Sequence, residues 1–343
     1  MQMNEWLALA AVAFAAACVV TLALGPVYIP WLRKLKFGQE IREEGPKWHQ
    51  VKSGTPTMGG IMFITGMAVA ACAVTILYCI RHGADADIMR LVVLFAVSLG
   101  FGLIGFVDDY IKVVKKRNLG LTAAQKFIMQ VVLAAIYVTA MFALGKLNPS
   151  VLIPFTHVEW TMPLWLYIPF VMFVVVGVVN AVNLTDGLDG LASSVTLVVS
   201  LFFITASYFF KDQYPAVMVF GGALAGGLIG FLRYNKYPAK VFMGDTGSLF
   251  LGAAVALTAI DMKLTIYLIL IGLVYLVETL SVIMQTTYFK ITKKKYGEGR
   301  RIFKMTPIHH HFEMCGWKEK KIVLVFTLIT LVMCAISYIG III

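Results

Sequence analysis

Long apolar runs separated by short polar connections recur along the whole chain. A run of about 18 or more apolar residues is typical of a transmembrane helix. We therefore expect one all-α integral membrane domain over residues 1–343, with about ten transmembrane helices. The pattern places these helices near residues 5–29, 59–80, 89–107, 122–144, 163–182, 190–209, 215–232, 246–260, 264–289 and 322–342.

The connection over residues 145–162 differs from the others because it contains two short stretches rich in β-forming residues. Residues 151–153 and 156–160 flank Pro154 and Phe155. Two such stretches around a turn are typical of a small β-hairpin. We expect this hairpin on the outer surface of the membrane.

Three residues within the apolar runs are interpreted structurally. Proline lacks the backbone N–H that a helix needs, so Pro26 and Pro30 are expected to end the first helix. Glu278 lies within the ninth run and is expected to be hydrogen-bonded to a neighbouring helix.

The composition supports a membrane protein. Apolar residues make up 60% of the chain, the mean hydropathy is +0.84, and only 14% of the residues are charged. A soluble domain carries about 25% charged residues. The five cysteines show no paired spacing, so neither a disulfide framework nor a zinc site is indicated.

Lysine and arginine are unevenly distributed, and this predicts the orientation. The odd-numbered connections between helices contain 23 of the 29 basic residues, and the even-numbered ones contain four. Because cytoplasmic loops carry the excess of Lys and Arg, the odd-numbered connections are expected in the cytoplasm and both termini outside. These basic loops explain the net charge of +11, so a nucleic-acid partner is not expected, and the lipid bilayer is the expected environment.

Five aspartates lie at the predicted cytoplasmic ends of helices. A single acid there could be an interface anchor, but five acids within short motifs containing Gly or Asn indicate a functional site. These residues are Asp108, Asp109, Asp186, Asp189 and Asp245.

Asp108 and Asp109 end the third predicted helix. Residues four apart share a helix face, which places Lys112 beside Asp108. Adjacent carboxylates repel each other, so their closeness requires a compensating cation. Mg²⁺, a hard cation that prefers oxygen ligands, is one candidate. The alternative is an Asp–Lys pair at a helix exit.

Polar residues recur every three positions between the fifth and sixth helices. Asn183, Asp186 and Asp189 are expected to share one face of a turn, and Gly187 and Gly190 permit close backbone approach. Such a turn favours polar recognition of a ligand. A helix cap would explain one aspartate but not the whole row.

The stretch Gly-Asp-Thr-Gly-Ser at residues 244–248 precedes an apolar run. Its backbone N–H groups are expected to point outward from a helix N-terminus, a geometry that favours phosphate. Asp245 would then be a metal ligand, since a bare carboxylate repels phosphate. Phe242 offers a flat face for a base, although packing is the commoner role of such a residue.

The last basic loop contains three consecutive histidines, His309, His310 and His311. Adjacent residues do not share a helix face, so three bonds to one zinc ion would be awkward. Phosphate contacts or acid–base chemistry fit better, and a metal role stays open. The lysines and arginines of this loop are interpreted as lipid headgroup contacts.

A glycine-rich turn over residues 52–60 joins a basic loop to the second helix. It contains Lys52 and Thr57 but does not match the phosphate-binding pattern GxxxxGK[ST], so an ATPase is not supported.

Together these motifs resemble those of the polyprenyl-phosphate N-acetylhexosamine-1-phosphate transferases. Ten helices with both termini outside also match that family, and residues 307–313 resemble its phospho-N-acetylmuramoyl-pentapeptide transferase branch in particular. The matching stretches, in the family's order, are residues 53–60, 108–109, 183–190, 241–248 and 307–313.

The resemblance implies a reaction. Phospho-N-acetylmuramoyl-pentapeptide would pass from UDP-N-acetylmuramoyl-pentapeptide to undecaprenyl phosphate. UMP would be released and undecaprenyl-diphospho-N-acetylmuramoyl-pentapeptide (lipid I) formed, in the first membrane step of peptidoglycan synthesis. The resemblance further implies Mg²⁺ as cofactor, a homodimer, and a multi-pass protein of the bacterial plasma membrane whose active site faces the cytoplasm.

It also implies roles for individual residues. Asp245 would ligate Mg²⁺. Asp108 would deprotonate or position the lipid phosphate, or act as the nucleophile of a two-step route, with Asp109 assisting, and His309 is a further catalytic candidate. The candidate substrate-binding residues are Lys52, Thr57, Lys112, Lys126, Asn183, Asp186, Gly187, Leu188, Asp189, Asn235, Phe242, Gln285, His310 and His311.

Two alternatives compete with this interpretation. A sibling enzyme would use UDP-N-acetylglucosamine as donor, and the histidine stretch argues against it. A transporter for an anionic solute would place its ionisable residues near mid-membrane. Here the motif aspartates gather at one predicted face, which favours an enzyme working at the membrane interface.

Overall fold

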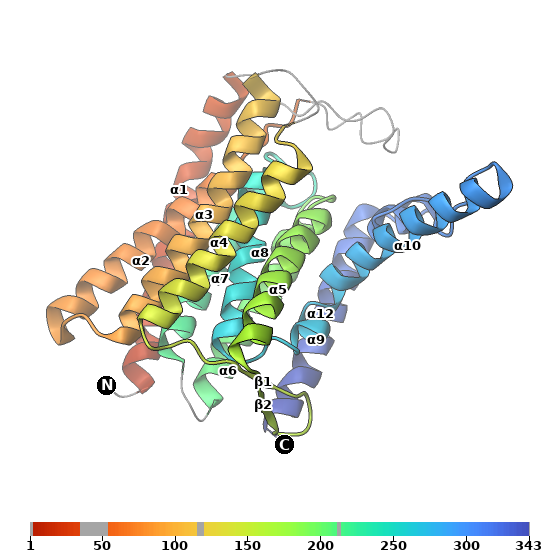
Figure 1. Ribbon diagram of the computed structural model, residues 1–343. Helices are drawn as coiled ribbons and strands as arrows, with labels where there is room; N and C mark the ends of the chain where they lie inside the picture. Colours follow the sequence, from red (N-terminus) through yellow and green to blue (C-terminus); the bar gives the residue numbers. More distant parts are fainter. Residues whose placement is uncertain (1–2, 35–53, 115–119, 211–213, 343) are drawn as a thin grey trace.

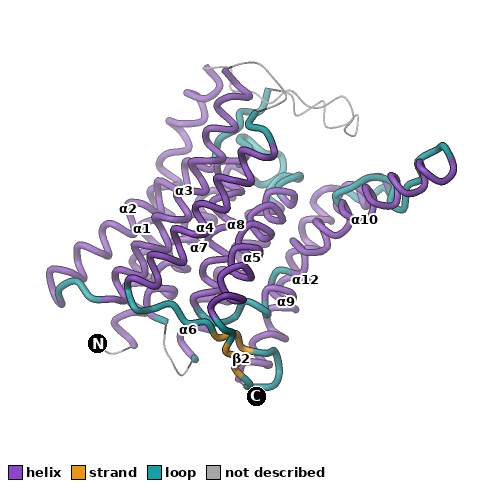
Figure 2. Tube along the Cα trace, in the orientation of Figure 1, coloured by secondary structure: helices purple, strands orange, loops and turns teal. Residues whose placement is uncertain are grey.

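The computed structural model describes residues 3–34, 54–114, 120–210 and 214–342 and is mostly helical (Figures 1 and 2). The helices are α1 (Met3–Lys34), α2 (Gly60–His82), α3 (Ala86–Val114), α4 (Ala123–Ala143), α5 (Leu164–Thr185), α6 (Leu191–Phe209), α7 (Pro215–Asn235), α8 (Gly244–Asp261), α9 (Leu268–Ile271), α10 (Leu273–Tyr296), α11 (Ile308–Met314) and α12 (Glu319–Ile342). Two short strands, β1 (Ser150–Leu152) and β2 (Glu159–Thr161), complete the fold.

The predicted all-α membrane fold is confirmed. Eight of the described helices, α1 to α7 and α12, are long and apolar enough to cross a membrane. The other two predicted helices correspond to α8 and to the pair α9 and α10. The ninth differs from its prediction: it begins at Leu268, breaks at Gly272 and continues to Tyr296. The short helix α11 was not predicted.

The first helix also differs from its prediction. Pro26 and Pro30 lie inside α1, which continues to Lys34. In a membrane helix, packing against neighbouring helices can compensate for the hydrogen bonds that proline removes. Here α1 packs along both α2 and α7.

Helices α7 and α8 form the buried centre of the bundle. Helix α7 packs against α1, α2 and α6, whereas α8 packs against α3 and α5. Small residues permit this closeness: a Cβ on Gly226 of α7 would lie 2.0 Å from the carbonyl oxygen of Phe14 in α1. Close backbone contact through small residues is typical of membrane helix packing, where burial away from water no longer drives association.

The predicted hairpin is confirmed. Strands β1 and β2 are antiparallel, and Val151 pairs with Trp160. The hairpin lies at the same end of the bundle as both chain termini, which we call the hairpin end (Figure 1). A buried ion pair joins α3 to α8 near this end, with Arg90 Nη2 2.7 Å from Asp261 Oδ1.

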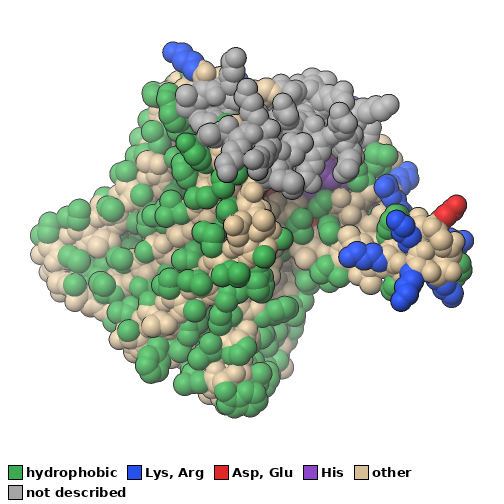
Figure 3. All heavy atoms as spheres, turned by 45° about the horizontal axis from the view of Figure 1, so that its top comes forward, with side chains coloured by type: hydrophobic (Ala, Val, Ile, Leu, Met, Phe, Trp, Pro, Cys, Tyr) green, Lys and Arg blue, Asp and Glu red, His purple; other side chains and the backbone are tan. Residues whose placement is uncertain are grey.

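The opposite end of the bundle is where α3, α5 and α7 finish and α8 begins, and we call it the acidic end. Helix α10 leans away from the other helices there, and its last turns project outward as an arm (Figure 2). Lysine and arginine side chains gather on this arm, and histidine is visible where it joins the bundle (Figure 3). The basic loop and the aspartate motifs therefore share one end of the molecule.

Candidate active site

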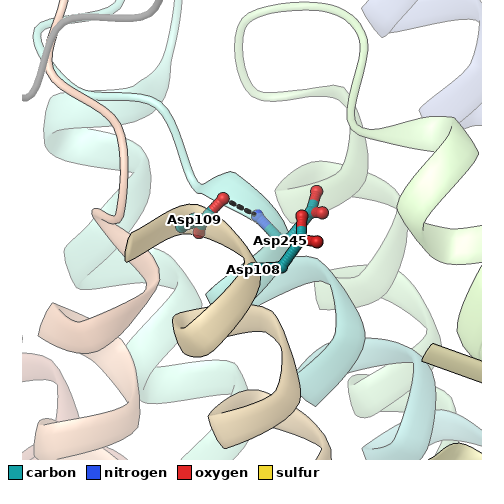
Figure 4. A group of neighbouring side chains, drawn as sticks. All are labelled: Asp108, Asp109 and Asp245. Atoms are coloured by element: carbon teal, nitrogen blue, oxygen red, sulfur yellow. Dashed lines mark hydrogen bonds between the residues drawn. The ribbon is translucent and has the colours of Figure 1, made fainter. Parts of the chain in front are cut away.

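Three aspartates converge at the acidic end. Asp108 and Asp109 lie near the end of α3, and Asp245 lies in the first turn of α8. Each offers a carboxylate oxygen, and these three oxygens lie within 4.8 Å of one another (Figure 4). The prediction that separate motifs form one site is thus realised for these acids.

A glycine contact between helices brings them together. Gly105 of α3 lies against the start of α8, where a Cβ would be 2.1 Å from the carbonyl oxygen of Asp245 and 2.6 Å from Thr246 N. No heavy side-chain atom fits in that space. The absence of a side chain at Gly105 therefore lets the first turn of α8 reach Asp108 and Asp109.

Asp109 is buried and serves as an acceptor for the start of α8. Its carboxylate accepts hydrogen bonds from Thr246 N at 2.9 Å, Thr246 Oγ1 at 2.8 Å and Asp245 N at 3.2 Å. Two of the N–H groups that were expected to face a phosphate, those of Asp245 and Thr246, therefore face the Asp109 carboxylate instead. A carboxylate at a helix N-terminus is stabilised by the helix dipole.

Two lysines hold the remaining aspartates. Lys112 Nζ lies 2.6 Å from Asp108 Oδ2 and 2.9 Å from Asp245 Oδ2. Lys126 Nζ, from the first turn of α4, lies 2.8 Å and 2.7 Å from the same two oxygens. The predicted pairing of Lys112 with Asp108 is confirmed, and two ammonium groups offset the repulsion between the carboxylates.

The end of α5 supports Asp245 from another side. The Asn183 amide donates to Asp245 Oδ1 at 3.0 Å and to Ser248 Oγ at 2.8 Å. Asp189 faces elsewhere, since its carboxylate accepts from Ala239 N at 2.9 Å and its own N–H donates to Glu319 at 2.5 Å. The expectation that Asn183, Asp186 and Asp189 share one face is wrong, because Asn183 is directed to the start of α8 and Asp189 to the loop after α7.

Asp186 caps α5 between these two residues and is partly buried. Burial, followed by repulsion from Asp245, raises the pKa of the Asp186 carboxyl well above its ordinary value. The next residues differ in exposure: Gly187 is partly exposed, whereas Leu188 is buried. The turn thus presents Asp186 and Gly187 beside the acids.

The glycine-rich turn before α2 packs against the loop before α8. Phe242 N donates to Pro56 O at 2.8 Å, and Gly59 N donates to Phe242 O at 2.8 Å. Thr57 is buried close to Gly244, where a Cβ would be 2.9 Å from Thr57 Oγ1. Thr57 and Phe242 are therefore brought together, whereas Lys52 lies outside the described residues.

The three histidines of α11 face three different partners. His309 Nδ1 is 3.0 Å from Glu278 Oε1, His310 Nδ1 is 2.7 Å from Glu313 Oε2, and His311 Nδ1 accepts from Lys304 N at 3.2 Å. This geometry agrees with the expectation that they do not ligate one metal ion together. It also confirms that Glu278 is bonded to a neighbouring helix.

Two predicted substrate-binding residues use their amide groups to support loops. Asn235 accepts from Ser193 Oγ at 3.0 Å and donates to Val241 O at 3.1 Å. Gln285 accepts from two backbone N–H groups and donates to Phe303 O at 3.0 Å. Both residues are buried, so they shape the loops beside the site.

Sequence reasoning missed several residues that position the site. Gly105 lies in a glycine-rich stretch of the third apolar run, which gave a weak signal. Thr246 lies within a motif already singled out, whereas nothing distinguished Glu319. Glu278 was not missed, since it was singled out in the sequence and its expected hydrogen bond to a neighbouring helix is present.

Comparison with known proteins now gives the class. Residues 91–263, which contain all three clustered aspartates, match glycosyl transferase family 4. Residues 52–64 match signature 1 of the phospho-N-acetylmuramoyl-pentapeptide-transferases. The chain is therefore a membrane protein of glycosyl transferase family 4.

Curated relatives resolve the class further. The chain is 47% identical over 321 residues to the phospho-N-acetylmuramoyl-pentapeptide-transferase of Clostridium beijerinckii, covering 93% of each protein. The enzyme of the same name from Acetivibrio thermocellus is 46% identical over 93% of this chain and 91% of its own length. That of Clostridium novyi is 44% identical over 95% of both. The chain belongs to the phospho-N-acetylmuramoyl-pentapeptide-transferase family.

Proposed function

We propose that this protein transfers phospho-N-acetylmuramoyl-pentapeptide from its UDP-linked donor to undecaprenyl phosphate, forming lipid I and releasing UMP. The observation that carries the proposal is the cluster of Asp108, Asp109 and Asp245 at the ends of membrane helices, bridged by two lysines. A soluble donor and a lipid acceptor can both reach such a position. One P–O bond forms, between the lipid phosphate oxygen and the β-phosphorus of the donor, and the β-phosphorus bond to UMP breaks.

Charge is the main chemical problem in this reaction, because donor and acceptor are both anions. Lys112 and Lys126 supply positive charge at the site, where exclusion of water strengthens electrostatic stabilisation. Asp108 contacts both ammonium groups and would position the lipid phosphate or accept its proton. In a two-step route, Asp108 would instead attack the β-phosphorus and expel UMP, and the lipid phosphate oxygen would then attack the same phosphorus and release the Asp108 carboxylate.

The acidic cluster fits a divalent metal ion. Its three carboxylates provide the oxygen ligands that Mg²⁺ prefers. We assign Asp245 as the principal ligand, with Asp108 and Asp109 close enough to contribute. When bound, Mg²⁺ supplies positive charge that offsets the charge of the diphosphate.

The nucleotide and sugar would lie between the loop before α8 and the turn after α5. Phe242 is half-buried and offers a ring for uracil, with Thr57 nearby. Asn183, Asp186 and Gly187 would line the other side. The uneven distribution of lysine and arginine supports a cytoplasmic position for this end of the bundle, and the family resemblance supports a homodimer.

A product assay tests the proposal. Purified protein is supplied with undecaprenyl phosphate, Mg²⁺ and either UDP-N-acetylmuramoyl-pentapeptide or UDP-N-acetylglucosamine. Lipid product and UMP from the first donor alone are expected. Product from the second donor alone would reassign the substrate, and no Mg²⁺-dependent product from either, with folded protein, would refute a transferase.

A further inference from the structure

One glutamate lies deep in the molecule without being part of the acidic cluster. Glu278 is in the second turn of α10 and is fully buried. Its carboxylate contacts His309 of α11 twice, at Nδ1 (3.0 Å) and at the backbone N–H (3.4 Å). A buried carboxylate is costly unless it is paired, so this pairing accounts for its presence in an apolar helix.

The pairing fixes the imidazole of His309. Because the partner of Nδ1 is a carboxylate, Nδ1 carries a proton and the ring cannot turn over without losing that hydrogen bond. Nε2 is therefore held on the opposite side. It is fully buried and has no hydrogen-bond partner among the residues that the structure describes.

Nε2 is directed at the turn after α5. A Cβ on Gly187 would lie 2.2 Å from His309 Nε2, so the imidazole rests directly against this glycine. Gly187 follows Asp186, and Asn183, which donates to Asp245, lies one turn earlier. The contact therefore joins α11, which carries the histidines, to the end of α5, which supports the acidic cluster.

A buried polar atom without a partner is rare and requires an explanation. We propose that Glu278 is a positioning residue that holds Nε2 of His309 ready to exchange a hydrogen bond with an oxygen of the nucleotide-sugar donor. This inference rests on the proposed function, and it adds α10 to the elements that shape the donor site. With a neutral ring, Nε2 would accept a hydrogen bond from a hydroxyl of the nucleotide-sugar. With a charged ring, it would donate one to a phosphate oxygen of the same substrate.

The test uses two variants of Glu278 in the full-length enzyme. In Glu278→Ala the imidazole loses its partner, and kcat/KM for the donor is expected to fall by about 10- to 100-fold, the usual cost of losing a residue that orients a functional histidine. Most of the loss should appear as a higher KM for the donor, with the KM for undecaprenyl phosphate unchanged. Glu278→Gln retains an oxygen acceptor and should recover part of the loss.

A double-variant comparison separates positioning from general destabilisation. If Glu278 acts through the imidazole, Glu278→Gln should cause no further loss in a His309→Ala background, because interacting residues are not additive. Gly187→Ala, which pushes against Nε2, should raise the donor KM in the same direction. Glu159→Gln is the control, since it alters an ion-paired carboxylate of β2 at the hairpin end, away from the acidic cluster and from the contacts between α3 and α8, and should leave the donor KM unchanged.

Each outcome has a distinct meaning. If the wild-type enzyme forms no lipid product, the proposed function fails and this inference fails with it. If the wild type is active but Glu278→Gln and Glu278→Ala retain its donor KM, only the role of Glu278 is refuted. The role would also be refuted if Glu278→Gln lowered kcat/KM by the same factor in the wild type and in the His309→Ala background, since a purely structural glutamate behaves in that way.

Discussion

Gly105 and Asp245 touch through their backbones, and this contact sets the distance between the two helices that carry the acids. A methyl group on Gly105 would lie 2.1 Å from the carbonyl oxygen of Asp245, closer than two non-bonded heavy atoms can approach. Because the neighbour is backbone, a larger residue can be accommodated only if α8 moves.

Gly105→Ala should therefore inactivate the enzyme while leaving it folded. A displacement of the order of 1 Å can reduce activity by about 100-fold, and we expect a loss of that size in product formation. Gly177→Ala is the matched control, since a Cβ there meets no atom within 4 Å. Equal activity of the two variants would show that the contact does not set the geometry of the site.

Asp245→Asn tests the metal site. The amide keeps the shape of the side chain but removes the charge that a metal ligand needs, so activity should fall by about 100-fold or more. Product formation is measured as a function of Mg²⁺ concentration. Near-normal activity with an unchanged Mg²⁺ requirement would remove Asp245 from the metal site, and Asp87→Asn at the other end of the bundle provides a control.

Lys112 and Lys126 should show strong coupling. Each ammonium group contacts both Asp108 and Asp245, so either one alone still bridges the two acids. Lys112→Met and Lys126→Met should each reduce activity, and the double variant should lose more than the sum of the two free-energy changes. Strictly additive losses would mean that the lysines act on separate groups.

Phe242→Ala tests the position of uracil. Stacking of a base on an aromatic ring contributes about 1–3 kcal/mol, so the affinity for UMP should fall by about tenfold or more. Binding is measured calorimetrically with protein of unchanged melting temperature. Tyr237→Ala, an exposed aromatic in the same loop, should bind UMP normally. Unchanged affinity in Phe242→Ala would place uracil elsewhere.

The sequence predicts the helices well because membrane spans are defined by length and apolarity alone. Each of the ten predicted runs contains a helix, although the ninth begins only at Leu268 and breaks at Gly272, and the hairpin at residues 150–161 was marked by its β-forming residues. The prediction of a helix end fails where packing between helices overrides the local preference of a residue. Pro26 and Pro30 were expected to end α1, yet packing against α2 and α7 carries the helix onward.

The site was predicted in part. The acidic motifs identified Asp108, Asp109 and Asp245, because charged residues beside apolar runs are informative. The sequence did not reveal that the three aspartates have different partners. Asp109 accepts hydrogen bonds from the first turn of α8, whereas Asp108 and Asp245 share two lysines. Those arrangements depend on which backbone atoms face which side chains, and residue spacing carries no such information.

Glycines and distant partners are harder still to predict. Nothing in residue type separates Gly105 from the other glycines of α3, although only Gly105 lies against Asp245. Glu319 is far from Asp189 along the chain, and its contact with the Asp189 N–H depends on how α12 begins beside the turn after α5. Such pairs become evident only when the chain is folded.

Helices α3 and α8 run antiparallel and are joined at both ends. Near the hairpin end Arg90 pairs with Asp261, and at the acidic end Asp109 binds Thr246. For helices of this length the two joints are roughly 25 Å apart, and two rods pinned so far apart cannot slide past each other by a turn. The relative positions of Asp108, Asp109 and Asp245 are therefore held by contacts at both ends of the α3–α8 pair.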